Sequence, residues 1–256
     1  ALLFFVVFFG LPHGALDTLV AKKFKLYKTI DEFLIFNLSY ILVAVAVFFI
    51  WITFPILSLS IFLLISGYHF SEDWNKYNLD FFTKTVLGFS IINLPILFHQ
   101  NSVERIYFFI TNDTYIYNLS SIQTLLAYAN IFLLFILLIR NFLSINILIH
   151  CCIILASAFF LEPVLFFICY FCFFHSYKNF KETMDNLTEI HTNKIRLAVA
   201  LNTAISIILG FIVYYYLLND LSFSSISTLV FVGLASLTVP HMLLKAIINY
   251  KALFFK

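Results

Sequence analysis

The sequence predicts an all-α fold, a polytopic helix bundle that forms a single integral membrane domain over residues 1–256. Three observations support this prediction. Of the 256 residues, 62% are hydrophobic and only 11% are charged, which excludes a soluble globular protein. Apolar runs long enough to cross about 30 Å of hydrocarbon recur along the chain. The lysine and arginine residues gather in alternate connections between these runs, and so on one side of the membrane, as they do in membrane proteins.

The apolar runs define roughly nine transmembrane segments, which we expect to be helices because an open sheet edge would leave unpaired amides in lipid. The first run ends in a lysine cluster and lacks a small-residue cleavage site, so we interpret it as a membrane segment and not as a signal peptide. Pro55 begins the third segment and Pro163 the seventh, and charged or polar stretches separate most of the others. The nine predicted segments are residues 1–20, 33–54, 55–70, 81–98, 121–139, 145–161, 163–175, 195–218 and 226–250.

The positions of the cationic residues orient the predicted bundle. With nine crossings, fourteen of the fifteen lysine and arginine residues fall on one side, and only Arg105 falls on the other. The positive-inside rule then places the N-terminus outside and the C-terminus in the cytoplasm. We therefore expect a multi-pass protein of the cell membrane, typical of a bacterial inner membrane. The charged stretch of residues 177–194 is predicted to be an amphipathic cytoplasmic loop.

Several common functions are excluded or disfavoured by composition and motifs. A formal net charge of +2 gives no electrostatic basis for binding nucleic acid. The four cysteines occur as Cys151-Cys152 and Cys169-x2-Cys172 inside apolar runs, where neutral thiols behave as small apolar residues. The six glycines form no phosphate-binding loop, and no serine or cysteine lies in a recognisable nucleophile motif.

Histidines within the membrane segments are the main candidates for function, because ionisable groups are costly in lipid. Under the predicted topology, four of them lie at one depth, in the cytoplasmic half of the bilayer, and could share a metal ion. They are His13, His69, His175 and His241. His99 falls on the outer side, His191 lies in the cytoplasmic loop, and His150 is held in reserve.

Polar residues four positions further on accompany three of these histidines, on the same helix face. The pairs are His13 with Asp17, His69 with Asp73, and His175 with Asn179. A metal-bound imidazole usually donates its other N–H to a carboxylate, so we expect Asp17 and Asp73 to orient their histidines. A set of imidazoles suits zinc, copper, nickel or iron, and redox-active iron with open positions is the favoured interpretation. The aromatic residues beside the candidate ligands are available to line a substrate tunnel: Tyr68, Phe70, Phe173 and Phe174.

These residues together resemble the Brp/Blh family of membrane-embedded β-carotene 15,15'-dioxygenases. The resemblance rests on Pro12-His13-Gly14-Ala15-Leu16-Asp17, His69-Phe70-x2-Asp73, His175-Ser176 and Pro240-His241, in this order. It implies an iron(II) enzyme that cleaves the central double bond of β-carotene with dioxygen, and whose product, retinal, supplies a rhodopsin.

The resemblance also implies that His13, His69 and His175 are iron ligands, together with a histidine four residues after His175. That position holds Asn179 here, so Asn179, His241 or water is expected to complete the ligand set. Three alternative functions remain at this stage. They are a transporter or proton channel that uses His13, Asp17 and His241 as a relay, a carotenoid-binding homologue without cleavage, and a di-iron desaturase. The desaturase is disfavoured because the chain lacks paired histidine boxes.

Overall fold

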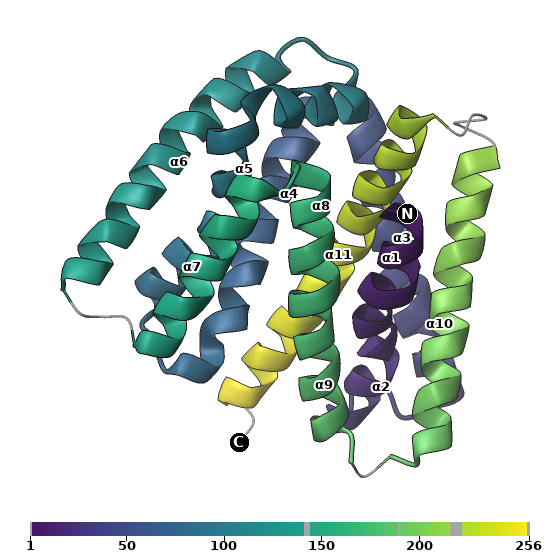
Figure 1. Cartoon of the computed structure of the whole chain (residues 1–256). Helices are drawn as coiled ribbons and strands as arrows, with labels where there is room; N and C mark the ends of the chain where they lie inside the picture. Colours follow the sequence, from purple (N-terminus) through teal and green to yellow (C-terminus); the bar gives the residue numbers. More distant parts are fainter. Residues whose placement is uncertain (1, 141–143, 189, 216–221, 255–256) are drawn as a thin grey trace. The chain divides into compact units, whose positions relative to one another are not determined.

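A computed structural model describes residues 2–140, 144–188, 190–215 and 222–254 of the chain. The side chains of residues 2, 3, 13, 223, 224 and 252–254 lie outside the described part. Helices and turns make up these described ranges, which contain no strand, so the predicted all-α class is confirmed (Figure 1).

The helices follow one another with short connections. In chain order they are α1 (Leu2–Phe5), the π-helix η1 (Val6–Gly10), the 3-10 helix η2 (Leu11–Leu16), α2 (Asp17–Lys23), α3 (Ile30–Thr53), α4 (Pro55–Ser71), the 3-10 helix η3 (Glu72–Tyr77), α5 (Phe81–Thr111), α6 (Ile116–Ile139), α7 (Ile145–Phe160), α8 (Pro163–Ile168), the π-helix η4 (Cys169–Ser176), α9 (Tyr177–Asn186), α10 (Thr192–Val213) and α11 (Phe223–Phe254).

Each of the nine predicted segments falls on a helical stretch, although residues 1 and 216–218 lie outside the described residues. Among the described residues, five helices are long and apolar enough to cross a membrane, namely α3, α5, α6, α10 and α11. The count of nine crossings and the orientation of the termini stay predictions. The fourth segment was expected to end at residue 98, and α5 is kinked at His99, whose backbone is not helical (φ −137°, ψ 45°).

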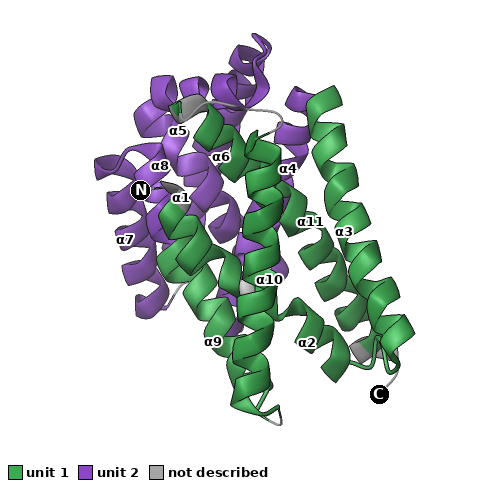
Figure 2. Ribbon diagram, turned by 90° about the vertical axis from the view of Figure 1, so that its right-hand side faces the viewer, with its two compact units in different colours: residues 1–53, 171–256 green, residues 54–170 purple. Residues whose placement is uncertain are grey.

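The described chain divides into two compact units, each of which we describe by itself (Figure 2). Unit 1 comprises residues 1–53 and 171–256, and α11 packs against α3 within it. Unit 2 comprises residues 54–170, in which α5 packs against α4, α6 and α7. The single membrane domain expected from the sequence stays a prediction.

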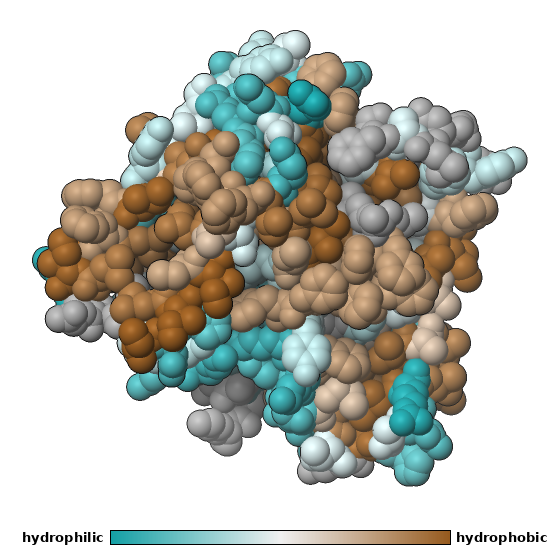
Figure 3. All heavy atoms as spheres, in the orientation of Figure 1, coloured by the Kyte–Doolittle hydropathy of each residue, from teal (hydrophilic) through white to brown (hydrophobic). Residues whose placement is uncertain are grey.

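Large apolar side chains are exposed on the helices that are long enough to cross a membrane. On α3, Leu38, Leu42 and Phe49 are each about 60% exposed, and α6 exposes Leu125 and Phe132 in the same way. Brown colouring in Figure 3 marks such apolar residues at the surface. Exposure on this scale is typical of helices that face lipid, because soluble proteins seldom present large apolar patches to water.

Unit 2 is held together by a close helix contact and by polar side chains between helices. A Cβ atom added to Gly88 of α5 would meet the backbone oxygen of Gly67 and the backbone of Ser71, both on α4. Between α5 and α6, Ser90 donates a hydrogen bond to Asn130 at 2.7 Å, and Tyr107 donates one to Gln123 at 2.7 Å. Small residues and interhelical hydrogen bonds are the usual means by which membrane helices associate.

Replacing Gly88 with alanine is therefore expected to destabilise the protein. The new methyl group would meet backbone atoms, which cannot move aside as a side chain can, at an expected cost of about 1–3 kcal/mol. The matched control is Gly233→Ala on α11, where the added Cβ meets nothing within 4 Å and helix propensity improves. Thermal unfolding in detergent measures the melting temperature of both variants. Equal melting temperatures would contradict the close contact between α4 and α5 at Gly88.

Candidate metal centre

The residues predicted to form the site are divided between the two units. His13, Asp17, His175, Asn179 and His241 belong to unit 1, as do Phe173 and Phe174. His69 and Asp73 belong to unit 2, with Tyr68 and Phe70.

His13 and His175 both lie on helical turns that are not α-helical. His13 lies in the 3-10 helix η2, one residue after Pro12, and its side chain is outside the described residues. His175 lies near the end of the π-helix η4. Short π-helical stretches are uncommon and often occur at functional sites, because the wider turn changes the direction of the side chains.

In unit 1, a buried carboxylate connects three helices. His241 Nδ1 on α11 lies 2.9 Å from both carboxylate oxygens of Asp17 on α2. Tyr40 on α3 donates its hydroxyl proton to Asp17 Oδ2 at 2.8 Å. Asp17 and His241 are both more than 90% buried. The spacing of four residues had paired Asp17 with His13, and that pairing stays a prediction because the side chain of His13 is not described. The imidazole in contact with Asp17 in the structure is that of His241.

The contact with Asp17 assigns a tautomer to His241. An ionised carboxylate only accepts hydrogen bonds, so the proton belongs on Nδ1. In the neutral imidazole, Nε2 then carries the lone pair that a metal ion requires. His241 therefore has the carboxylate partner that the sequence analysis had assigned to other histidines.

His175 is fully buried, and its ring is fixed by an aromatic neighbour. The ring of Phe171 stacks on it with centroids 5.8 Å apart and an interplanar angle of 16°. Phe171 in turn lies against Gly10 of η1, where an added Cβ would come within 2.7 Å of the phenyl ring. The absence of a side chain at Gly10 is thus what lets Phe171 pack beside His175.

Asn179 lies between His175 and a lysine of α11. Its amide nitrogen is 3.4 Å from His175 Nδ1, and its oxygen is 3.4 Å from the ammonium nitrogen of Lys245. Both distances exceed the usual range for hydrogen bonds. The contact with Asn179 therefore does not fix the tautomer of His175. Lys245 follows His241 by one turn of α11, so Asn179 links the turn after His175 to the turn after His241.

In unit 2, His69 and Asp73 each contact a residue that the spacing of four did not suggest, and the contact between the two stays a prediction. His69 is buried, and its Nδ1 lies 3.3 Å from the carboxylate of Glu72. Asp73 is 1% exposed and accepts a hydrogen bond of 2.8 Å from the hydroxyl of Tyr170. Glu72 is thus an acidic neighbour of the His69 ring, and Asp73 forms a buried pair with Tyr170.

The four aromatic residues assigned to substrate lining differ in exposure. Tyr68 and Phe173 are nearly half exposed, and Phe173 packs its ring against Phe5 and Phe9 with centroids 5.6 and 5.3 Å away. Phe174 is partly buried. Phe70 is buried and meets Tyr170 edge to face, so it supports the Asp73 partner. The lining role of these residues stays a prediction.

The remaining histidines have other surroundings. The ring of His150, the reserve candidate, packs near Trp74 and Tyr77 in unit 2. His191 caps the start of α10 by accepting the amide of Asn193. Among the described side chains, which exclude that of His13, no group of three or more His, Cys, Asp or Glu residues is placed to hold a metal ion. The meeting of His13, His69 and His175 at one ion therefore stays a prediction.

Four residues at these sites were missed by the sequence analysis. Tyr40 and Tyr170 contact aspartates that lie 23 and 97 positions away, and Phe171 was one of many aromatic residues in its segment. No local pattern marks any of these three. Glu72 follows His69 by three positions, which is also a one-turn spacing on a helix, and that signal could have identified it.

Comparison with known proteins addresses the family. No solved structure matches the chain. A curated protein from the uncultured marine bacterium 66A03, named β-carotene 15,15'-dioxygenase, is 32% identical over 250 residues, which cover 93% of this chain and 90% of that protein. The family model for β-carotene 15,15'-dioxygenase matches residues 4–249. This match spans every motif described above, and the chain belongs to the β-carotene 15,15'-dioxygenase family.

Proposed function

We propose that this chain cleaves the central 15,15' double bond of β-carotene with dioxygen and forms two molecules of retinal. Support comes from the family match over residues 4–249 and from the name of the curated relative. The observation that carries the proposal within the molecule is the buried imidazole of His241, backed by Asp17. Such a pair is the usual support of a metal-bound histidine.

The reaction balances without an additional reductant. The carbon–carbon double bond breaks, each of its two carbons becomes an aldehyde carbon, and the two oxygen atoms of one dioxygen molecule are consumed. No proton is lost or gained overall. The chain must therefore bind a long apolar polyene, keep its central bond in place, and exclude water from it.

We propose that a non-haem iron(II) ion serves this reaction, held by His13, His69, His175 and His241. Imidazole nitrogen suits iron, and the two of these histidines in unit 1 whose side chains are described are both buried. Iron(II) with open coordination positions would supply the redox chemistry that allows dioxygen to react with a double bond. The role of Asp17 is to hold the proton of His241 at Nδ1, so that Nε2 can ligate.

His241 is the better fourth ligand than Asn179 on electrostatic grounds. The Asn179 oxygen faces the ammonium group of Lys245, and a divalent cation at that oxygen would be repelled by the lysine charge at short range. A cation at His241 would instead be attracted, because the carboxylate of Asp17 stabilises positive charge near the imidazole ring.

The aromatic surface formed by Phe5, Phe9 and Phe173 is the part of unit 1 that we propose contacts the polyene. These rings lie at 5.3–5.6 Å centroid distances around Phe173, and Phe9 and Phe173 are almost half exposed. A β-carotene molecule dissolved in the bilayer could reach such a surface laterally, without entering water. Retinal formed there would leave into the same membrane, where a retinal-binding rhodopsin could take it up.

Pigment analysis tests the proposed activity. A β-carotene-producing host that expresses this chain is expected to lose its orange colour and to accumulate retinal, about two molecules for each β-carotene consumed. The control is the same host with His175→Ala, which should keep its colour. Colour retained by the wild-type host, with no retinal in the extract, would contradict cleavage. If β-carotene then co-purified with the chain, the protein would be a carotenoid-binding homologue.

Iron content of the purified protein tests the ligand assignment. We expect about one iron per wild-type chain and a loss of at least tenfold in iron affinity for His241→Ala, because a ligand is removed. Asn179→Ala should retain its iron, since the amide is not assigned as a ligand. His191→Asn is the matched control, because it changes an exposed histidine and keeps a side chain that can cap α10. Iron lost in Asn179→Ala and kept in His241→Ala would reverse the assignment.

A third experiment concerns the support of His241 by Asp17. Asp17→Asn keeps the size of the side chain and removes its charge, and we expect iron affinity to fall about 10–100-fold. Tyr40→Phe removes only the hydroxyl hydrogen bond and leaves the contact between Asp17 and His241, so a smaller decrease is expected. Metal titration of the two variants measures both effects. An Asp17→Asn protein with wild-type iron affinity would show that this carboxylate does not support metal binding.

A further inference from the structure

Unit 1 contains a pocket whose lining includes none of the histidines. Its volume is about 390 Å³, and it is bordered by the end of α2, the start of α3 and the start of α10. Because α3 and α10 are candidate membrane spans, a pocket at their first turns lies where hydrocarbon meets the headgroup region. The positive-inside rule assigns this end of the helices to the cytoplasmic face.

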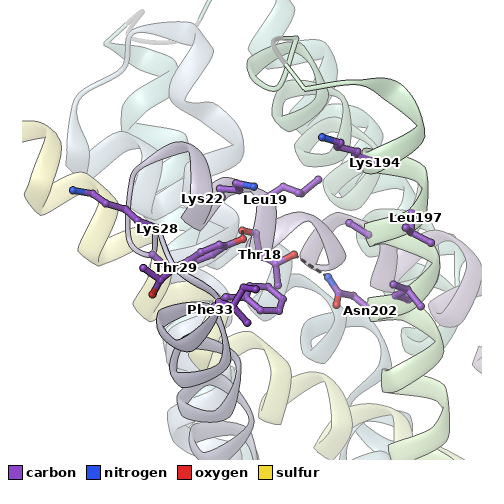
Figure 4. A pocket seen from close by; sticks show the side chains of 13 residues that line it. Thr18, Leu19, Lys22, Lys28, Thr29, Phe33, Lys194, Leu197 and Asn202 are labelled. Carbon is purple, nitrogen blue, oxygen red and sulfur yellow. Dashed lines mark hydrogen bonds between the residues drawn. The ribbon is translucent and has the colours of Figure 1, made fainter.

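Three lysines from three different parts of unit 1 border this pocket. Lys22 lies in the last turn of α2, Lys28 precedes α3 and Lys194 lies in the first turn of α10. Figure 4 shows all three toward the loop end of the pocket, while Phe33 and Asn202 lie further along the helices. Within the described part of the chain, these three ammonium groups form no hydrogen bond or ion pair. By comparison, Lys23 beside them donates to the backbone oxygen of Asn186.

Asp31 and Glu32 are the acidic residues nearest in sequence to Lys28, and Glu32 interacts electrostatically with its ammonium group. The carboxylate of Glu32 accepts the backbone amides of Lys28 and Thr29, at 2.6 and 3.3 Å, and so caps the start of α3. Glu32 does not line the pocket. Three cationic groups therefore surround an opening whose lining includes no carboxylate.

The remainder of the pocket is apolar and open toward the outside of the helices. Leu19, Phe33, Leu197 and Leu201 line it, and the two leucines of α10 are more than half exposed. At its base, Asn202 donates hydrogen bonds to the backbone oxygen of Ala15 and to the Thr18 hydroxyl, at 2.7 and 3.1 Å. The pocket thus combines a cationic entrance with an apolar side that continues along α10.

We propose that this pocket binds an anionic phospholipid, with its phosphate among Lys22, Lys28 and Lys194 and an acyl chain along Phe33, Leu197 and Leu201. The charge of the three lysines complements a phosphodiester, and the leucines complement hydrocarbon. Basic pockets between membrane helices on the cytoplasmic side are typical sites for such headgroups. The binding is independent of cleavage activity, so each proposal can fail without the other.

Native mass spectrometry of the purified full chain tests this site with dioleoyl phosphatidylglycerol and dioleoyl phosphatidylcholine as probes. The wild type is expected to retain the anionic lipid at least about tenfold better than the zwitterionic one, given the attraction of each lysine for anionic headgroups. Glycerol phosphate, which carries the same anion without chains, should bind much more weakly than phosphatidylglycerol. Equal retention of the two lipids, or glycerol phosphate binding as tightly as the lipid, would overturn the proposal.

Variants locate the lipid within the protein. The triple variant Lys22→Gln, Lys28→Gln and Lys194→Gln should lose the preference for phosphatidylglycerol. The control variant Lys76→Gln, Lys181→Gln and Lys251→Gln removes the same charge from the same predicted face, outside the pocket, and should keep the preference. An equal loss in both would indicate a general charge effect and refute the site.

A second variant keeps the test decisive if the triple variant fails to fold. Leu197→Trp with Leu201→Trp places bulky rings where the acyl chain is proposed to lie, and leaves every lysine in place. Both leucines are mostly exposed, so the change should not disturb the core. We expect retention of phosphatidylglycerol to fall several-fold while the protein elutes as the wild type does. Unchanged retention would show that the lipid does not occupy this pocket.

Discussion

The pairing of buried carboxylates is the constraint on which the arrangement of the site depends. A charge taken out of water is destabilising unless hydrogen-bond donors surround it, and a lipid environment offers no water to complete its shell. Asp17 meets this requirement with a tyrosine from α3 and a histidine from α11. One side chain on α2 therefore fixes two other helices of unit 1 and decides which nitrogen of His241 is free to ligate. Loss of either partner would leave an insufficiently compensated charge in the interior.

The same arrangement recurs in unit 2 on different residues. Asp73, like Asp17, accepts a tyrosine hydroxyl at 2.8 Å, and the tyrosine comes from a distant part of the chain. Phe70 packs edge to face against that tyrosine. In both units the aspartate lies four residues after a histidine of the family motif, and in both the structure joins it to a tyrosine that the motif does not contain. The two carboxylates thus hold helices of their units together, and they also orient the side chains that donate to them.

Much of the fold was predictable from the sequence because hydrophobicity and helix boundaries are local properties. Pro55 and Pro163 begin helices as expected, and the kink at His99 lies at the predicted end of a segment. The partners of the candidate ligands were not predictable in this way. The i,i+4 rule paired Asp17 with His13, whose side chain lies outside the described part, and it gave no sign of the contact with His241, which joins residues 224 positions apart. Such long-range pairs are set by how helices pack, and spacing along one helix carries no information about that packing.

The π-helical turn that contains His175 has a consequence for how the chain tolerates change. A π-helix closes its hydrogen bonds over five residues and not four, so it accommodates one residue more than the α-helix on either side. Deletion of a single residue between positions 169 and 174 would allow ordinary α-helical bonding and so improve the local backbone. A deletion at positions 172–174 would also rotate the imidazole of His175 by about 100° relative to Phe171, away from the ring on which it stacks. A change of length that relaxes this helix would therefore turn the imidazole of His175 away from its neighbour, whereas substitutions leave the direction of the ring unchanged.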